Sequence, residues 1–234
     1  MEERDGMEQQ KTSLNLTKDR KELEIRGTPM FPCEAYTGNV RNYISGEIPW
    51  HWHEELEAVY ILNGRMRVGV DSGSFTLEKG EGLLINSGAL HSGRAAMEGE
   101  CRYNSFVFHE SLISGSAESV LGRRYVRPFT SRREIPGVYL KKDGGWREEA
   151  AGCILKAYQA YEKGGFGFEF PVREQLSHMW YLMVTHMENG LMREPVKESL
   201  EAARIKTMIS YIQEHFKENL ELRDIAESAS IGER

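Results

Sequence analysis

Short runs of β-forming residues alternate with turn signals between residues 24 and 108. Inside this region Met66, Val68 and Val70 alternate with more polar or smaller residues, as in a strand with one buried face. The turn signals are Thr37-Gly38-Asn39, Ser45-Gly46, Asn63-Gly64, Asp71-Ser72-Gly73 and Lys79-Gly80. Strands separated by turns at a spacing of about ten residues predict a β-sandwich or β-barrel.

The apolar pattern takes helical spacing further along the chain. The first helix has Trp146, Ala150, Ile154, Ala157 and Tyr161 on one face, and Gly164-Gly165 ends it. A second helix opens at Pro171 and ends near Gly190. Its apolar stripe consists of Val172, Leu176, Met179, Trp180, Met183 and Met187. Residues 114–136 are irregular and basic, and two further helices are predicted over residues 205–216 and 222–229.

Composition narrows the class of protein. The 234 residues are 40% hydrophobic and 28% charged, with a formal net charge of -6. Non-specific nucleic-acid binding by the whole chain is therefore not expected, while a local basic patch on one element stays open. No apolar run is long enough to span a membrane, and residues 1–10 are too polar for a secretory signal. Cys33, Cys101 and Cys153 form no CxxC pair, so we expect reduced thiols and a cytoplasmic protein.

Four side chains with metal-ligating chemistry stand out. His51, His53 and Glu57 are two and four residues apart, so one extended strand would aim all three in the same direction. A hairpin partner carrying His91 could complete a four-ligand site. Three imidazoles and a carboxylate suit Zn, Ni, Fe or Mn. Trp50 and Trp52 have the opposite parity and are expected in packing or on the outer face.

The spacing around these residues resembles the two motifs of the cupin family. The first runs from Gly46 through the histidines and Glu57 to Gly64, and the second from Gly80 through Asn86 and Gly88 to His91. Two positions depart from the pattern, since Asn86 stands in place of the usual proline and Ala95 in place of a frequent asparagine. The resemblance implies a jelly-roll-like barrel with the four side chains inside it.

The segment from His51 to Glu57 also resembles the sensor domain of AraC-type transcriptional regulators. In that family the pocket commonly binds an effector without catalysis, so His51, His53, Glu57 and His91 are candidates both for effector binding and for a divalent metal. Alternatively, they are polar groups lining the barrel that hydrogen-bond a ligand or one another. The expected pocket has apolar walls that include Val59, Ile61, Val68 and Ile85, and it would hold a small polar effector, for which a sugar is one candidate.

The last 31 residues resemble the opening of an AraC-type helix-turn-helix domain. The resemblance rests on Ile205, Met208, Tyr211-Ile212, His215-Phe216, Leu222, Asp224-Ile225-Ala226 and Ala229-Ser230-Ile231. Gly232 stands where the family usually has a serine cap. Because the chain ends at Arg234, we expect a truncated DNA-binding domain without its recognition helix, and DNA-contacting residues are therefore unknown.

These observations predict a mainly β plus α protein, in which a cupin barrel precedes helices and the start of a helix-turn-helix domain. We expect a flexible N-terminal arm at 1–22, a sensor barrel at 23–115, a helical dimerisation segment at 116–195, and a linker with the truncated domain at 196–234. The helical segment, with its Met183 and Met187, is expected to form a homodimer.

Two functions are consistent with this organisation. The first is a ligand-responsive transcription regulator that is not an enzyme and has no catalytic residues, with a small-molecule effector and promoter DNA as partners and no membrane. The alternative is a metal-dependent cupin enzyme of the isomerase or dioxygenase type, and a stand-alone binding module is a weaker third reading. The helix-turn-helix resemblance favours the regulator, because such an enzyme has no need of it.

Overall fold

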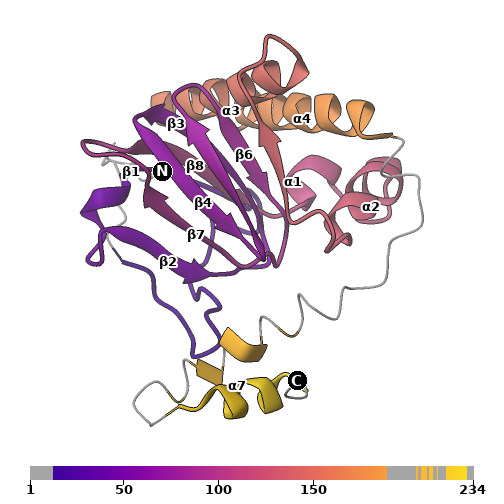
Figure 1. Cartoon of the computed structure of the whole chain (residues 1–234). Helices are drawn as coiled ribbons and strands as arrows, with labels where there is room; N and C mark the ends of the chain where they lie inside the picture. Colours follow the sequence, from indigo (N-terminus) through magenta and orange to yellow (C-terminus); the bar gives the residue numbers. More distant parts are fainter. Residues whose placement is uncertain are drawn as a thin grey trace.

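Two antiparallel sheets face each other and form the barrel (Figure 1). The computed structural model describes residues 13–188, 204, 207–209, 211–212, 215 and 220–230. The five-stranded sheet has the order β1-β8-β3-β6-β9, and the four-stranded sheet has the order β2-β7-β4-β5. The strands are β1 (Cys33–Asn39), β2 (Glu47–His51), β3 (Leu56–Asn63), β4 (Arg65–Val70), β5 (Gly73–Glu78), β6 (Gly82–Ile85), β7 (His91–Ala95), β8 (Arg102–Phe108) and β9 (Gly137–Leu140).

The order of the strands confirms the predicted jelly-roll-like sandwich. The β4–β5 hairpin has the alternation predicted for Met66, Val68 and Val70, all of which are buried. The Asn63-Gly64 signal joins β3 to β4, and Gly64 has a φ of 79° there. A Cβ at this glycine would lie 2.2 Å from the carbonyl oxygen of Glu100, so the turn needs glycine for two reasons.

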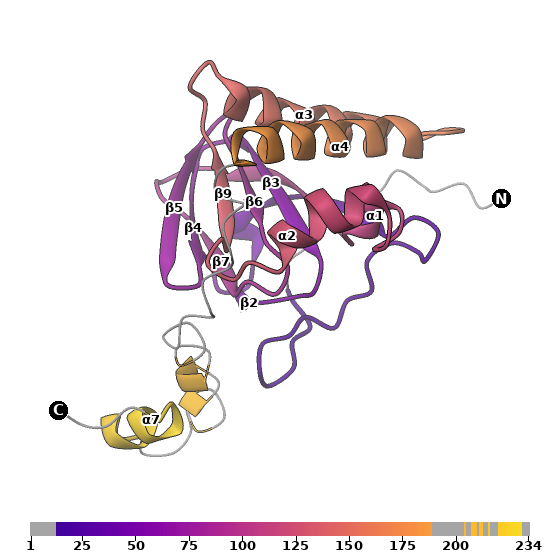
Figure 2. The same ribbon diagram turned by 90° about the vertical axis from the view of Figure 1, so that its right-hand side faces the viewer.

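Helices α3 (Trp146–Lys163) and α4 (Glu169–His186) lie side by side over the outer face of the five-stranded sheet (Figure 2). Both predicted helices are confirmed, and Pro171 lies in the first turn of α4, where a missing N–H costs nothing. The stripe from Val172 to Met183 is buried against α3 and the sheet, and Met183 itself is fully buried. This part of the predicted dimerisation surface therefore lies inside the chain.

The basic stretch 114–136 that we expected to be irregular contains short helices. It lies between α1 (Ser111–Ser114) and β9, which pairs with β6, and it forms a π-helical turn at Gly122–Val126 and α2 (Arg127–Thr130). Arg132 is buried in this stretch, where its Nε donates to the carbonyl of Pro128. Four-residue elements of this kind carry too little periodicity to be recognised in a sequence.

The predicted C-terminal helix is present as α7 (Leu222–Ser228). A capping box between Glu221 and Asp224 begins it. Most of the helix predicted over 205–216, the end near Gly190 and the end of the predicted helix-turn-helix lie outside the described residues. No helix in the described part of the chain is both long and apolar enough to cross a membrane.

Residues 13–22 of the expected N-terminal arm lie against the barrel. The indole Nε1 of Trp52 donates to the carbonyl of Asp19, and the backbone N–H of Glu22 donates to the carbonyl of Trp52. The side chain of Glu22 is buried. The sequence pattern did not predict this contact, because the segment is polar. Backbone groups and charges hold it to the barrel, rather than apolar side chains.

Candidate metal and ligand site in the barrel

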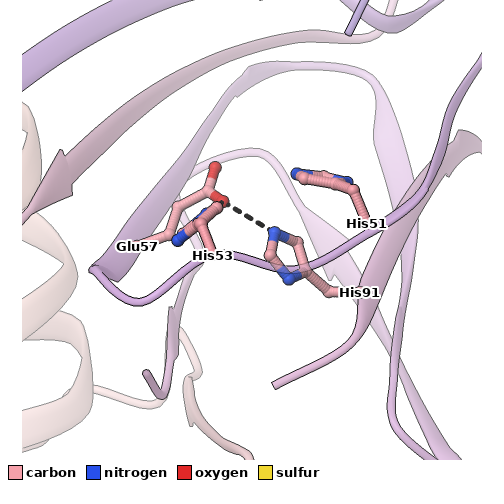
Figure 3. A group of neighbouring side chains, drawn as sticks. All are labelled: His51, His53, Glu57 and His91. Atoms are coloured by element: carbon pink, nitrogen blue, oxygen red, sulfur yellow. Dashed lines mark hydrogen bonds and ion pairs between the residues drawn. The ribbon is translucent and has the colours of Figure 1, made fainter. Parts of the chain in front are cut away.

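The four predicted ligands come together inside the barrel, where they are carried by both sheets (Figure 3). His51 ends β2 and pairs with His91, the first residue of β7, in the four-stranded sheet. His53 lies in the connection that follows, and Glu57 lies on β3 of the five-stranded sheet. The expectation of one continuous strand is therefore wrong: the chain crosses between the sheets at residues 52–55, and this crossing aims the three side chains at one point.

One donor atom from each of the four side chains lies within 4.8 Å of the others. Glu57 Oε2 is the centre of the group, 3.0 Å from Nε2 of His91 and 3.4 Å from Nε2 of His53. The rings of His51 and His91 have centroids 4.1 Å apart. All three imidazoles are at least nine-tenths buried.

Backbone carbonyls fix the orientation of all three imidazoles. Nδ1 of His51 lies 2.9 Å from the carbonyl oxygen of Pro49, that of His53 lies 3.1 Å from Glu55, and that of His91 lies 2.8 Å from Ala89. Because a carbonyl oxygen can only accept, each Nδ1 carries the proton. In the neutral ring Nε2 then presents a lone pair to the interior, which is the arrangement that metal-binding histidines usually have.

The Nε2 atoms of His53 and His91 both lie near Glu57 Oε2, and two acceptors cannot approach this closely without a proton or a cation between them. Burial lowers the pKa of His51 well below its ordinary value, and the neighbouring His91 lowers it further, which keeps this ring neutral. Burial alone would raise the pKa of Glu57, but hydrogen bonds to His53 and His91 hold it well below its ordinary value. Burial likewise opposes charge on His91, yet Glu57 raises its pKa. Either a proton on His91 or a divalent cation satisfies this arrangement.

Ser105 on β8 supports the carboxylate from behind. Its hydroxyl donates to Glu57 Oε1, which leaves Oε2 directed at the imidazoles. Sequence reasoning missed this residue. The signal was the alternation of Tyr103, Ser105 and Val107, which puts one small polar side chain on an otherwise apolar strand face.

A cavity of about 40 Å³ adjoins the cluster. It has room for a few water molecules, since one water needs roughly 10–15 Å³, whereas pockets for drug-sized ligands begin near 300 Å³. Val59, Val68 and Ile85 line it as predicted, while Ile61 is buried without lining it. The remaining polar lining consists of Glu22, Arg26, Tyr36, Tyr43, His51, Glu57, His91, Ser92, Tyr103 and Ser105.

The phenols of this cavity are neutral. The hydroxyls of Tyr43 and Tyr103 lie 3.1 Å apart, and burial raises the pKa of Tyr43 to about 12. The charged groups of the lining are therefore two carboxylates, on Glu22 and Glu57, and the guanidinium of Arg26. With neutral imidazoles their sum is -1, which favours a cation over an anion in this cavity.

Asn86, at the position where cupins usually have proline, fastens the barrel to α2 and to the segment that follows it. Its side-chain Nδ2 lies 3.0–3.1 Å from the carbonyl oxygens of Phe129, Arg132 and Ile135, and its backbone N–H donates to Pro136. Proline could make none of these bonds. The departure from the motif therefore has a structural role, separate from ligation.

Comparisons with known proteins agree with the fold. The cupin domain family matches residues 44–108, which include all four clustered side chains. An uncharacterized HTH-type transcriptional regulator of Bacillus subtilis (strain 168), YdeC, is 28% identical over 218 residues, which are 90% of this chain and 71% of the relative.

Among solved structures, ToxT from Vibrio cholerae is 9% identical with a TM-score of 0.45, over 86% of this chain and 72% of its own. An RmlC-like cupin from Shewanella frigidimarina is 16% identical with a TM-score of 0.29, over 33% of this chain and 67% of its own. The chain therefore contains a cupin domain and is a relative of a protein named as an HTH-type transcriptional regulator.

Proposed function

We propose that the chain is the sensor part of an HTH-type transcriptional regulator, in which the cluster of His51, His53, Glu57 and His91 is the effector site. The relationship with YdeC, which is named as a regulator and not as an enzyme, supports the regulatory function over the isomerase or dioxygenase alternative. The C-terminal helices that include α7 would belong to the DNA-binding domain, with promoter DNA as the partner of the full-length protein.

A divalent cation is the ligand that the cluster fits best. The observation that carries this proposal is the set of three Nδ1–H groups donated to backbone carbonyls, which leaves the Nε2 atoms for a cation, and those of His53 and His91 lie 3.4 and 3.0 Å from Glu57 Oε2. Zn, Ni, Fe or Mn would bind at these four side chains, where the cation supplies the positive charge that the facing acceptors require. A sugar does not fit about 40 Å³ unless the cavity opens.

The contacts around the cluster offer a route from cation binding to the helices. The N–H of Gly88 donates to the carbonyl of His53, so the loop that carries Asn86 is tied to a ligand. Asn86 in turn holds the carbonyl of Phe129, whose ring packs edge-on against Trp180 of α4 at 5.2 Å. If the cation binds more tightly when this loop is in one position, binding would shift the equilibrium toward that position. The arrangement of the helices that is coupled to it would become more populated to the same extent.

We also propose a homodimer through the helical layer, but with contact residues other than Met183. Because Met183 is buried, the contacting residues would be the exposed apolar side chains of the layer, namely Phe170 and Tyr181 on α4 and the preceding Phe166. Light scattering of the chain should then give about twice the 26.8 kDa chain mass. A monomer at tens of micromolar would refute this part.

The regulatory proposal is tested on the full-length protein with its own upstream DNA. Gel-shift titrations with and without Mn²⁺ or Zn²⁺ should give apparent Kd values that differ several-fold, and the double variant His51→Ala, His53→Ala should abolish the difference.

A thermal-shift panel separates the effector classes: we expect the cations to stabilise the wild type and sugars to have no effect. Equal DNA affinity in all conditions would contradict cation sensing, and stabilisation by sugars alone would favour an organic effector.

A further inference from the structure

Glu22 is a second carboxylate beside the cluster, brought there from outside the barrel strands. Its side chain is 1% exposed and lines the same cavity, with Oε2 4.0 Å from Nε2 of His51. Its backbone is tied to the ligand segment, because its N–H donates to the carbonyl of Trp52, the residue between the two histidines. The N–H of Trp52 donates in turn to the carbonyl of Arg20. The position of Glu22 is thus coupled to that of the ligands.

The distances are close to those of a common coordination sphere. Metal–nitrogen and metal–oxygen bonds are about 2.0–2.2 Å, so two ligands of one ion are at most about 4.3 Å apart. The separation between Glu22 and His51 is within this limit, and the four clustered donors exceed it by only about half an ångström. A small contraction around an ion would bring these four donors into range, and Glu22, which lies outside the group of four, would join them by turning its carboxylate toward the ion.

Arg26 pairs with the Glu22 carboxylate and has further partners of its own. The guanidinium forms an ion pair with Glu22 Oε2, with both side chains almost fully buried. Arg26 also donates to the hydroxyl of Tyr36 and lies 3.5 Å from the partly exposed carboxylate of Glu24. If Glu22 turned one oxygen toward a cation, Arg26 would keep the other oxygen and these two further partners.

Charge balance favours this rearrangement. Three neutral imidazoles and Glu57 leave one uncompensated positive charge on a bound divalent cation, and such a charge is costly in a buried cavity. Glu22 would neutralise that charge, and Glu24, whose carboxylate lies 3.5 Å from Arg26, would balance the guanidinium that Glu22 leaves. From these contacts we infer that Glu22 is an additional ligand of the cation at His51, His53, Glu57 and His91, and this inference rests on the proposed cation site. A fifth protein donor favours Mn²⁺, Fe²⁺ or Ni²⁺ over the four-coordinate geometry of structural Zn²⁺ sites.

Calorimetric titration of the whole chain with Mn²⁺ and with Zn²⁺ tests the inference. Glu22→Gln should weaken Mn²⁺ binding by about tenfold or more, as losses of supporting groups at metal sites do, and should weaken Zn²⁺ binding clearly less. Glu24→Gln is the matched control, because Glu24 also contacts Arg26 but does not line the cavity; it should bind both ions as the wild type does. With Co²⁺ as the probe, Glu22→Gln should increase the intensity of the visible bands as the coordination number falls.

The outcomes separate this inference from the proposal on which it rests. A wild type that binds neither ion would overturn the cation site as a whole. Wild-type affinity and unchanged Co²⁺ bands in Glu22→Gln, together with loss of binding in His51→Ala, His53→Ala, would overturn only the role of Glu22. If Glu22→Gln unfolds because Arg26 is left unpaired, the double variant Glu22→Gln, Arg26→Gln removes both charges, and the same loss of Mn²⁺ affinity is expected.

Discussion

The two faces of the five-stranded sheet differ sharply, although they are built from the same strands. On β8, Phe106 and Phe108 face the helical layer, where they are fully buried among apolar side chains of α3 and α4. The intervening Tyr103, Ser105 and Val107 face the cavity, where hydroxyls and carboxylates mix with apolar walls. The helix face is mainly an apolar core in which Asn104 is the polar exception on β8, whereas the cavity face holds many polar groups that burial penalises unless something satisfies them.

This difference separates stability from binding within one sheet. Changes on the helix face should reduce the free energy of unfolding and leave the intrinsic affinity for a cation intact. Changes on the cavity face should do the reverse. The following predictions are ordered by the size of the expected effect.

Met183→Asp places a carboxylate in the middle of the helix-face core and should have the largest effect. We expect a loss on the order of 5 kcal/mol in the free energy of unfolding, because no partner for the charge exists in this apolar cluster. Tyr181→Asp on the exposed side of the same helix is the control and should change stability by no more than about 0.5 kcal/mol. Urea unfolding followed by circular dichroism measures both. Equal stability of the two variants would refute the assignment of Met183 to the core.

Phe106→Ala should cost about 3–5 kcal/mol, the usual range for removal of a buried phenylalanine. The side chain packs edge-on against Tyr158 and Tyr161 of α3, so its loss leaves a cavity under the helix. Under conditions in which the variant is folded, calorimetry should give the wild-type Mn²⁺ affinity. A clear loss of affinity in the folded variant would mean that the two faces are not independent.

Asn86→Ala tests the link between the barrel and the chain from α2 to Pro136. Three carbonyl oxygens lose their shared donor, and we expect a cost of about 2–3 kcal/mol. Backbone amides in residues 127–136 should exchange hydrogen faster than in the wild type, while those of β4 and β5 stay protected. Unchanged exchange in residues 127–136 would show that Asn86 does not hold this segment.

Ser105→Ala, one residue from Phe106 but on the opposite face, should have the smallest effect on folding. We expect about tenfold weaker Mn²⁺ binding, because Glu57 loses the hydroxyl that orients its carboxylate. Ser105→Thr keeps the hydroxyl and should bind nearly as well as the wild type. If Ser105→Ala bound the cation as tightly as Ser105→Thr, orientation of Glu57 by this residue would be unnecessary.

Most of the fold and the four clustered side chains could be predicted from the sequence, because both depend on local patterns. Turn signals and alternation predicted the strands, helical spacing predicted α3 and α4, and the motif spacing identified His51, His53, Glu57 and His91. Ser105 and Glu22 were not predicted, since their roles depend on contacts between distant segments. The same limit explains why Met183 was assigned to a dimer surface: periodicity marks an apolar stripe but does not say what covers it.

Metal content tests the central claim most directly. The chain is purified without a histidine tag, equilibrated with a divalent cation, freed of unbound ion and analysed for metal and protein. We expect about one equivalent in the wild type and none in His51→Ala, His53→Ala, because each of these residues would supply one nitrogen ligand. Absence of metal from the wild type, or metal that survives the double substitution, would contradict the assignment of a cation site to this cluster.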